Sequence, residues 1–451
     1  MRRLFIVLFL ILFSIVLSGC VFDVQNADMM RPPKLPTELE AVRTALGIYY
    51  GTGMELINPS TGDQTGAIQF EDLDGDDQKE AIAFFKNEND QNALKVAILS
   101  HDATLEKWFA RSPIVGVGYD IDQVAYPDFD GDGIKEIAIG WLGGSTLNKG
   151  LSIYKQSDVV PVSPQGLKGY EEIFREVYTL FKCVDFNQDG TEELLTLHLS
   201  RPDNKAEARL YTMRAMGIEQ IDTTSLAGDV HRYEWISVGQ FDFEKRCVAI
   251  DASLSGGATF TEVLVEKEGK LVNVFETEGS SESSLTYRSD FRLTEDVDRD
   301  GWLEFPTLIR PVGYERISTG DVPWITAWNH WDSTEKLKSV MRTYDDNVLG
   351  FRFKLPDHWG DTVSLTRNAQ GAAFVEVRQG EIERKKIIEI AVRPRSEADK
   401  AESQMLESGY FELARAIDYV YYGKLYSVET LSDPSLSVSK EIVIKNFLVL
   451  N

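Results

Sequence analysis

Short runs of apolar residues, some alternating with polar ones, fill the middle of the chain and predict β-strands. Two such runs flank each of several tight polar turns, for example at 180–184 and 194–197. Further runs, such as 94–99 and 260–265, bring the predicted strands to about four in each period of the sequence. This regular spacing of short strands is typical of a mainly β protein built from repeated sheets.

The polar turns repeat one nine-residue acidic pattern. Its four clear copies, named loops I to IV here, span residues 72–80, 128–136, 185–193 and 296–304. Their first aspartates are separated by 56, 57 and 111 residues, and a worn copy that begins at Asp242 divides the last gap into 57 and 54. Position two is apolar in all five copies. Because the worn copy is located by its spacing and not by this position, the agreement is independent support for the repeat. The period predicts a β-propeller of at least five four-stranded blades.

Each loop presents oxygen atoms at alternate positions. Side chains at positions one, three, five and nine, with the carbonyl of position seven, approach the about six to eight oxygens that Ca²⁺ takes. Magnesium is disfavoured because it demands octahedral geometry and keeps its waters. Glycine at position six of loops II, III and IV suits a left-handed turn, and loop I has Asp77 there. The four loops resemble the FG-GAP/VCBS family of calcium-binding propeller repeats.

The resemblance implies a ligand set in each loop and about four structural Ca²⁺ ions. The implied ligands are Asp72, Asp74, Asp76, Gln78 (carbonyl) and Glu80; Asp128, Asp130, Asp132, Ile134 (carbonyl) and Glu136; Asp185, Asn187, Asp189, Thr191 (carbonyl) and Glu193; and Asp296, Asp298, Asp300, Trp302 (carbonyl) and Glu304. The worn copy has Arg246 at position five and Ile250 at position nine, so we expect no metal there. The alternative is solvated acidic turns without metal, but such clustered carboxylates repel one another.

The amino terminus has the layout of an export signal. Residues 1–19 carry Arg2 and Arg3 and then an apolar run that is short for a membrane span. The segment 17–20, Leu-Ser-Gly-Cys, resembles the lipobox of bacterial lipoproteins. The resemblance implies cleavage before Cys20, acylation of Cys20 (for example with palmitate), and a lipid anchor on the extracytoplasmic side of a bacterial cell membrane. An ordinary signal peptide or membrane anchor is the alternative. Residues 20–36, with three prolines, then form a tether.

The pattern changes after loop IV. We assign residues 37–343 to the propeller and residues 344–451, which contain no acidic loop, to a small C-terminal α+β domain. Strands are predicted there at 350–355, 362–365, 373–377, 386–392, 410–416 and 419–425, and helices at 396–407 and near 437–448. Because this pattern shares nothing with the repeat, we expect the domain to fold on its own.

Candidate chemistry outside the loops is sparse. The net charge of −25 argues against a nucleic-acid partner. Motifs of metalloproteases, P-loop proteins and serine hydrolases are absent from the sequence. Trp324, Trp328 and His330 fall on one face of a predicted strand, where they form either a platform for a sugar or peptide or the core of the last blade. Cys183 and Cys247 lie in adjacent predicted blades, and the sequence leaves open whether they pair.

These observations predict a membrane-anchored, surface-exposed lipoprotein. Its calcium-stabilised propeller would be a binding or assembly module for an envelope protein or a cell-wall glycan. Two alternatives stay open. One is a cell-envelope polysaccharide-processing enzyme with its site in the propeller channel, and the other is a passive structural spacer.

Overall fold

The computed structural model describes residues 37–51, 53–87, 93–143, 149–157, 167–215, 217–241, 245–275, 281, 284–331, 336–378 and 381–450. The predicted signal, Cys20 and the tether lie outside these residues, as do Asp242, Phe243 and Glu244 of the worn copy. Within the described part of the chain, no helix is both long enough and apolar enough to span a bilayer.

The described chain is mainly β, as predicted, and forms six antiparallel sheets. Sheet 1 contains β1 (Met54–Leu56), β2 (Ile68–Glu71), β3 (Glu80–Asn87), β4 (Ala93–Asp102), β5 (Lys107–Ala110) and β6 (Ile114–Val115). Sheet 2 contains β7 (Asp120–Ala125), β8 (Ile137–Leu142), β9 (Lys149–Ser157) and β10 (Gly169–Tyr178). Sheet 3 contains β11 (Leu180–Val184), β12 (Glu193–Ser200), β13 (Lys205–Arg214) and β14 (Gly217–Leu226).

The remaining sheets complete the chain. Sheet 4 contains β15 (Arg232–Gln240), β16 (Arg246–Ser253), β17 (Thr259–Lys267) and β18 (Lys270–Asn273). Sheet 5 contains β19 (Phe305–Ile309), β20 (Ile325–Trp331), β21 (Leu337–Asp346), β22 (Phe351–Lys354) and β28 (Phe447–Val449). Sheet 6 contains β23 (Val363–Asn368), β24 (Gly371–Arg378), β25 (Glu381–Pro394), β26 (Tyr410–Arg415) and β27 (Tyr419–Leu425). The α-helices are α3 (Thr37–Tyr50), α4 (Arg395–Glu407) and α5 (Lys440–Lys445).

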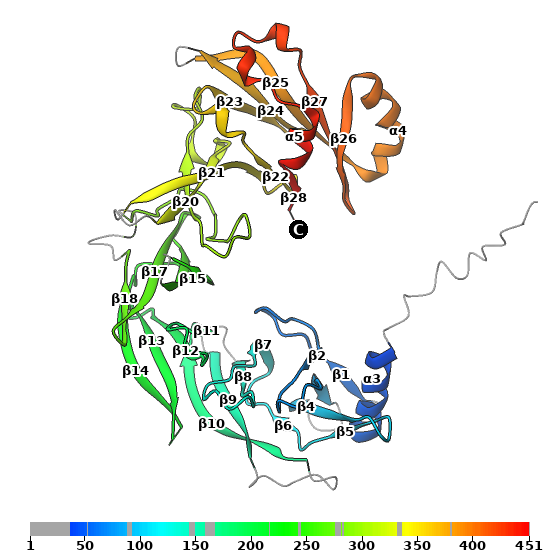
Figure 1. Ribbon diagram of the computed structural model, residues 1–451, viewed down its shortest axis with the longest axis vertical. Helices are drawn as coiled ribbons and strands as arrows, with labels where there is room; N and C mark the ends of the chain where they lie inside the picture. The colour runs from blue at the N-terminus through cyan, green and yellow to red at the C-terminus, as the bar shows by residue number, and fades with distance from the viewer. Residues whose placement is uncertain are drawn as a thin grey trace, which may run out of the picture.

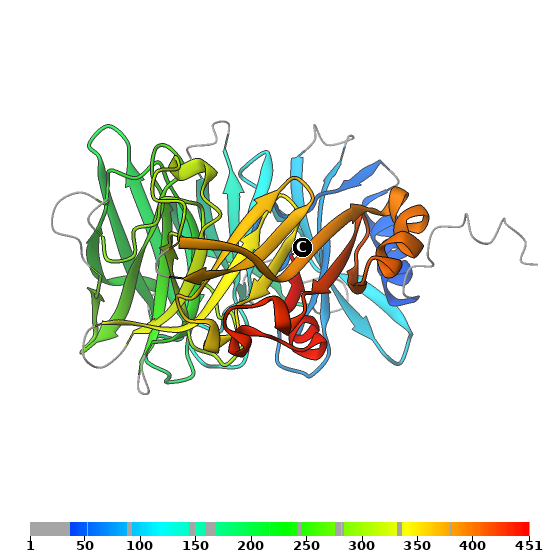
Figure 2. The same ribbon diagram turned by 90° about the horizontal axis from the view of Figure 1, so that it is seen from above.

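The six sheets follow one another around an arc in chain order (Figure 1). In sheets 2 to 4, the first strands (β7, β11 and β15) lie on the inner, concave side of the arc, and the last strands lie toward its outer rim. Strand β11 contacts β15, and β14 contacts β18, so neighbouring sheets pack face to face. From above, sheets 3 and 4 form one side of the molecule, and sheets 1 and 6 lie on the other side (Figure 2).

A separate hydrophobic core fills the space between each sheet and the next. The core between sheets 3 and 4, for example, includes Leu195 and Val248. Central strands are therefore buried on both faces: all residues of β3 except Lys86 and all residues of β16 except Arg246 are buried. This explains why these strands are apolar runs rather than alternating ones. Stacked antiparallel sheets of this kind give a propeller-like arrangement.

A helix covers each end of the arc. Helix α3 packs Val42 and Leu46 into a core with residues of β3 and β4 in sheet 1. Helix α4 contacts β25, β26 and β27, and its Met405 joins Val420 and Tyr422 of sheet 6 in a small core. Figure 1 shows the two helices on opposite sides of the opening in the arc. The helices thus cover apolar sheet faces that a closed ring would pack against each other.

The C-terminal residues are joined to the repeat region more closely than the sequence predicts. The predicted boundary between 343 and 344 lies inside β21. Beyond it, β22 pairs with β21, and β28 pairs with β22, so both strands belong to sheet 5. One core includes Ile325 from one side of the boundary and Phe374 from the other. The helix predicted near 437–448 is shorter: α5 begins after Ser439, whose side chain accepts a hydrogen bond from the Ile442 N–H, and gives way to β28.

Candidate metal centres and an inner pocket

Loop I connects β2 to β3, loop II connects β7 to β8, and loop III connects β11 to β12. Loop IV directly precedes β19. Position six takes a left-handed conformation in all four loops, as predicted. The φ angles there are 65° at Asp77, 81° at Gly133, 91° at Gly190 and 92° at Gly301. Aspartate is among the few residue types that tolerate this conformation, which explains why loop I turns as the others do.

Three hydrogen bonds recur in every loop. The position-one carboxylate accepts from the backbone N–H of position six at 2.9–3.1 Å. The position-five carboxylate accepts from the N–H of position seven at 2.8 Å. The position-nine glutamate accepts from the N–H of position two at 2.8–3.1 Å. Together these bonds fix the orientation of three carboxylates in each loop.

The fixed carboxylates converge. Within three of the loops, ligand oxygens of three residues lie within 4.8 Å of one another: Asp72, Asp74 and Glu80; Asp128, Asp130 and Glu136; and Asp296, Asp298 and Asp300. In loop III, Asn187 replaces the aspartate of position three, and its amide donates to Asp189 Oδ2 at 3.0 Å. In loop I, Asp74 Oδ1 is buried and has no hydrogen-bond partner among the described residues. This oxygen-rich set, with a buried acceptor left over, fits a hard divalent cation.

The position-nine glutamates are the buried members of each cluster. Glu80, Glu136, Glu193 and Glu304 are exposed by 6% or less. Burial raises the pKa of Glu80 and of Glu193 to about 7, and it also raises the pKa of Glu136 and of Glu304. A cation beside these carboxylates would favour their ionised form and offset the cost of burial.

Basic side chains from outside the repeat pattern enter loops I and II. Arg111, which is 3% exposed, places Nη2 2.6 Å from Asp74 Oδ2 and 3.6 Å from Glu80 Oε1. Lys155 of β9 places Nζ 2.6 Å from Asp130 Oδ2, 3.5 Å from Asp132 Oδ2 and 3.0 Å from Glu136 Oε1. Two of the four candidate metal centres therefore contain a side-chain cation among the predicted ligands.

Loops III and IV differ from the first two. Among the ion pairs of the described ranges, none joins a lysine or arginine to a carboxylate of these loops. In loop III, Glu193 Oε1 lies 3.5 Å from the amide nitrogen of Asn187. In loop IV, Glu304 Oε1 contacts His330 Nε2, and the Trp302 ring packs on that imidazole with 5.5 Å between centroids. A neutral or titratable group thus occupies the place that a fixed cation takes in loops I and II.

Neighbouring loops are bonded to each other through their backbones. The Lys135 N–H of loop II donates to the Leu73 carbonyl of loop I at 3.0 Å. The Glu192 N–H of loop III donates to the Asp128 carbonyl of loop II at 3.3 Å. A Cβ on Gly75 would lie 2.8 Å from the Gly133 carbonyl oxygen, so only glycine fits this approach. An ion that orders one loop would therefore also hold the next sheet in place.

The structure bears on two points that the sequence left open. Trp324 is 9% exposed and Trp328 is 1% exposed, so both tryptophans are buried in the core rather than open as a ligand platform. Trp328 donates from Nε1 to Thr343 Oγ1 at 2.9 Å, and Arg352 covers its ring, which is the core-packing alternative. The third member, His330, contacts loop IV instead. Cys183 and Cys247 form no disulfide, because they lie in different cores, between sheets 2 and 3 and between sheets 4 and 5.

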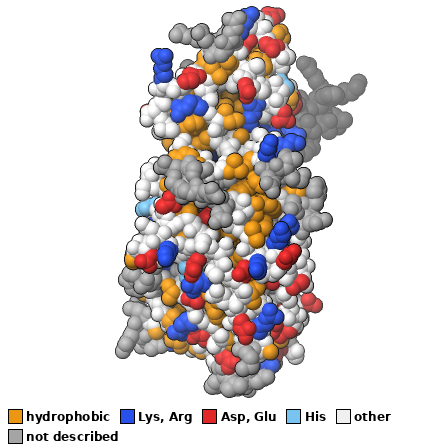
Figure 3. Space-filling view, turned by 90° about the vertical axis from the view of Figure 1, so that its left-hand side faces the viewer, with side chains coloured by type: hydrophobic (Ala, Val, Ile, Leu, Met, Phe, Trp, Pro, Cys, Tyr) orange, Lys and Arg blue, Asp and Glu red, His pale blue; other side chains and the backbone are white. Residues whose placement is uncertain are grey.

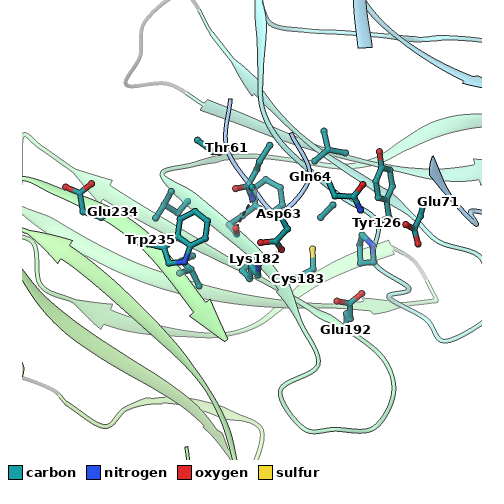
Figure 4. A pocket seen from close by; sticks show the side chains of 18 residues that line it. Thr61, Asp63, Gln64, Glu71, Tyr126, Lys182, Cys183, Glu192, Glu234 and Trp235 are labelled. Atoms are coloured by element: carbon teal, nitrogen blue, oxygen red, sulfur yellow. Dashed lines mark hydrogen bonds and ion pairs between the residues drawn. The ribbon is translucent and has the colours of Figure 1, made fainter. Parts of the chain in front are cut away.

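A pocket of 260 Å³ opens on the inner side of the arc. It is lined by β7, β11 and β15, by residues 61–64, by residues that precede loops I and II, and by Glu192 of loop III. Figure 4 shows Asp63, Lys182 and Cys183 in its middle, Trp235 on one side, and Gln64, Tyr126 and Glu71 on the other. Trp235 is 39% exposed and is the only one of the eight tryptophans, all of which are described, with so exposed a side chain.

Most charges around this pocket are already paired. Lys182 binds Asp63 at 2.6 Å, Arg232 binds Glu234 at 2.7 Å, and Lys135 binds Glu71. Glu192 accepts from the Asp128 N–H at 3.3 Å, and burial raises its pKa. On the opposite surface, the outer rim, charges of both signs are interspersed with apolar side chains (Figure 3). The inner pocket therefore combines a hollow, an exposed aromatic ring and several hydrogen-bonding groups.

Comparisons with known proteins give only distant similarities. No family model matches the chain, and no curated protein does. Among solved structures, a rhamnogalacturonan lyase from Bacillus licheniformis matches with TM-score 0.31 and 13% identity over 64% of this chain and 58% of its own. The rhamnogalacturonan lyase YesW matches with TM-score 0.33 and 13% identity, over 73% and 68%.

The propeller domain of the trilobed protease from Pyrococcus furiosus matches with TM-score 0.28 and 11% identity, over 72% of this chain and 89% of its own. The chain thus spans little more than half the length of the first lyase. At such low similarity, these structures support no inference about activity, and the function must be argued from the site itself.

Proposed function

We propose that the protein is a lipid-anchored binding or assembly module of the bacterial cell envelope, and that Ca²⁺ in loops I to IV stabilises its sheets. The observation that carries this proposal is the shared geometry of the four loops, in which the same three backbone hydrogen bonds orient carboxylates toward one another. The nine-residue pattern and its resemblance to FG-GAP/VCBS repeats support Ca²⁺ over other divalent ions.

The role of the ion is structural in this proposal. In loop II, every side-chain ligand position holds a residue that also bonds the loop backbone or a neighbouring side chain. Little room is left for a substrate at the ion. Binding only to the folded state stabilises that state, by about 2.7 kcal/mol per site at a hundredfold excess over Kd.

Direct metal analysis tests the proposal. The detergent-solubilised full chain is dialysed against millimolar Ca²⁺ with excess Mg²⁺, and bound metal is counted by mass spectrometry. We expect about four calcium ions per chain, and fewer in Asp130→Ala, which removes a loop II ligand. Asp203→Ala, an exposed aspartate of the β12–β13 turn, is the matched control and should leave the count unchanged. A chain that binds no calcium under these conditions contradicts the proposal.

The lipid anchor is tested separately. Cys20→Ala should accumulate as an uncleaved precursor or leave the membrane, because it lacks the thiol that would carry the acyl chain. Unchanged mass and unchanged membrane retention of this variant would refute acylation.

A second candidate function is a polysaccharide-processing enzyme with its site in the inner pocket. The observation in its favour is that four carboxylates line this pocket: Asp63, Glu71, Glu192 and Glu234. Glycosidic cleavage uses two carboxyl groups of different pKa, and burial raises the pKa of Glu192. Release of reducing ends from envelope glycans, abolished in Glu192→Gln, would favour the enzyme. Binding without any cleavage would favour the module.

A further inference from the structure

We infer that the inner pocket binds a neutral pyranose unit of a glycan and that the indole of Trp235 is its stacking surface. The inference rests on the proposed function as a binding module and names the site and the ligand class. It draws on three features of the pocket: the placement of Trp235, the hydrogen-bonding groups opposite it, and the way the charges are neutralised.

Trp235 is placed where a ligand can reach it. Its neighbours in β15, Tyr233 and Ile236, are buried, whereas Trp235 is 39% exposed and lines the pocket. The register of β15 against β16 shifts between Tyr233 and Trp235, which marks a β-bulge. Bulges re-aim side chains and are common beside binding sites. The backbone of Trp235 remains paired with Asp251, so the ring is presented on a rigid strand, and little conformational entropy is lost on binding.

An indole face suits one side of a pyranose, where C–H groups project, and hydroxyl groups around the ring need hydrogen-bond partners. The pocket supplies such groups. Gln64 and Gln123 offer side-chain amides. Gln123 donates from Nε2 to the Phe181 carbonyl at 2.9 Å, which leaves its amide oxygen for a ligand hydroxyl. Asp63 and Glu192 offer carboxylate oxygens, each able to accept more than one bond. The volume of 260 Å³ accommodates one sugar ring rather than a folded peptide segment.

The charges favour a neutral ligand. Three of the four lining carboxylates already bind Lys182, Lys135 or Arg232. A cationic ligand would have to displace these side chains or rely on Glu192 alone, which already accepts from the Asp128 N–H at 3.3 Å. An anionic sugar would meet four carboxylates, and the only lysine among the lining residues, Lys182, already binds Asp63. A hydroxyl-rich neutral ring neither displaces the paired side chains nor is repelled by the carboxylates.

Saturation-transfer NMR on the full chain tests the inference. The probes are soluble neutral oligosaccharides (maltopentaose, cellopentaose, xylopentaose and chitopentaose), with trigalacturonate as the anionic and chitosan trimer as the cationic comparison. We expect saturation of ring protons in at least one neutral probe. Trp235→Ala should weaken its binding about tenfold, the size expected for loss of an aromatic contact of roughly 1.4 kcal/mol.

Two variants serve as controls. Trp235→Phe keeps an aromatic face and should retain most of the affinity. Tyr119→Ala removes a somewhat more exposed ring, 49% exposed, that does not line the pocket, and should change nothing.

The inference is overturned if no neutral probe binds, if only a charged probe binds, or if Trp235→Ala binds as tightly as the natural chain. Thermal unfolding of the same samples with and without Ca²⁺ reports on the scaffold separately. A calcium-stabilised chain that binds no neutral glycan would contradict this inference and leave the proposed scaffold standing.

Discussion

An arginine or lysine side chain pairs with carboxylates of loops I and II, whereas no lysine or arginine of the described residues pairs with carboxylates of loops III and IV. Arg111 and Lys155 lie within ion-pair distance of predicted calcium ligands in the first two loops. In the described residues, the buried glutamates of the other two loops face Asn187 and His330 instead. The nine-residue pattern is nearly the same in all four. Equal ligand patterns therefore do not imply equal dependence on metal, because the neighbour that neutralises the cluster comes from another strand.

We expect the two pairs of loops to differ in how far their shape depends on calcium. A buried carboxylate cluster needs a compensating positive charge, and a side-chain cation can supply it without an ion. Loops I and II would therefore keep their shape at low calcium, and an entering ion would have to displace Arg111 or Lys155. Loops III and IV would depend on the ion itself.

Replacing the buried guanidinium of loop I should have the largest effect. In chelator, Arg111→Met leaves Asp74 and Glu80 uncompensated, and loss of one partner of a buried pair costs about 3 kcal/mol or more. Calcium should restore most of the loss, because the ion then replaces the missing charge. Denaturant unfolding in chelator and in millimolar calcium measures the loss of stability and its restoration. Lys155→Met, at a half-buried lysine, should show the same pattern with a smaller loss. Equal destabilisation in both buffers would break the comparison.

The position-one aspartates provide a matched pair. In millimolar calcium, Asp185→Asn of loop III should lose up to about 2.7 kcal/mol, the value for one site at a hundredfold excess over Kd. Asp128→Asn of loop II should lose less, because Lys155 still neutralises Asp130 and Glu136. Both aspartates accept from the backbone at positions four or five and six, so the local cost of substitution is similar. The comparison fails if both variants lose the same stability.

Calcium titration should resolve two classes of site. Loops III and IV should fill at lower calcium than loops I and II, where a side-chain cation competes. Lys155→Met should move one site from the weaker class to the tighter one. Calorimetric titration of the chelator-stripped chain measures this. Four equivalent sites that Lys155→Met leaves unchanged would contradict the competition.

The smallest expected effect is on the pH dependence of the metal-free chain. Burial raises the pKa of Glu193 from 4.5 to about 7, so between these values the folded state binds more protons than the unfolded state. Stability in chelator should therefore fall as pH rises from about 5 to 7. Calcium should remove this dependence by favouring the ionised carboxylate. Glu193→Gln should reduce the slope in chelator without abolishing it, because burial also raises the pKa of Glu80 to about 7. An unchanged slope would count against loop III as one of its sources.

The sequence predicts the loops and their flanking strands well, because both depend on short-range patterns. The strand 180–184 is predicted residue for residue, and the left-handed turn at position six holds even at Asp77. Arg111 and Lys155 escape prediction because they stand at different distances from their loops and lie outside the repeat.

Two other features depend on three-dimensional packing. Trp235 of β15 and Trp328 of β20 both stand in strands, and only a bulge and the packing of the sheets make one ring exposed and the other buried. Strand β28 joins sheet 5 through contacts across almost a hundred residues of chain, which no local pattern encodes. The sequence therefore reveals candidate ligands more readily than the groups that compete with them.

The central claim is that calcium stabilises the sheet array through these loops. Thermal unfolding of the detergent-solubilised full chain, compared in chelator, in millimolar Mg²⁺ and in millimolar Ca²⁺, tests it most directly. The account predicts a clearly higher Tm in Ca²⁺ than in the other two buffers, with Asp185→Asn losing part of the difference. The same Tm in chelator and in Ca²⁺ would contradict it.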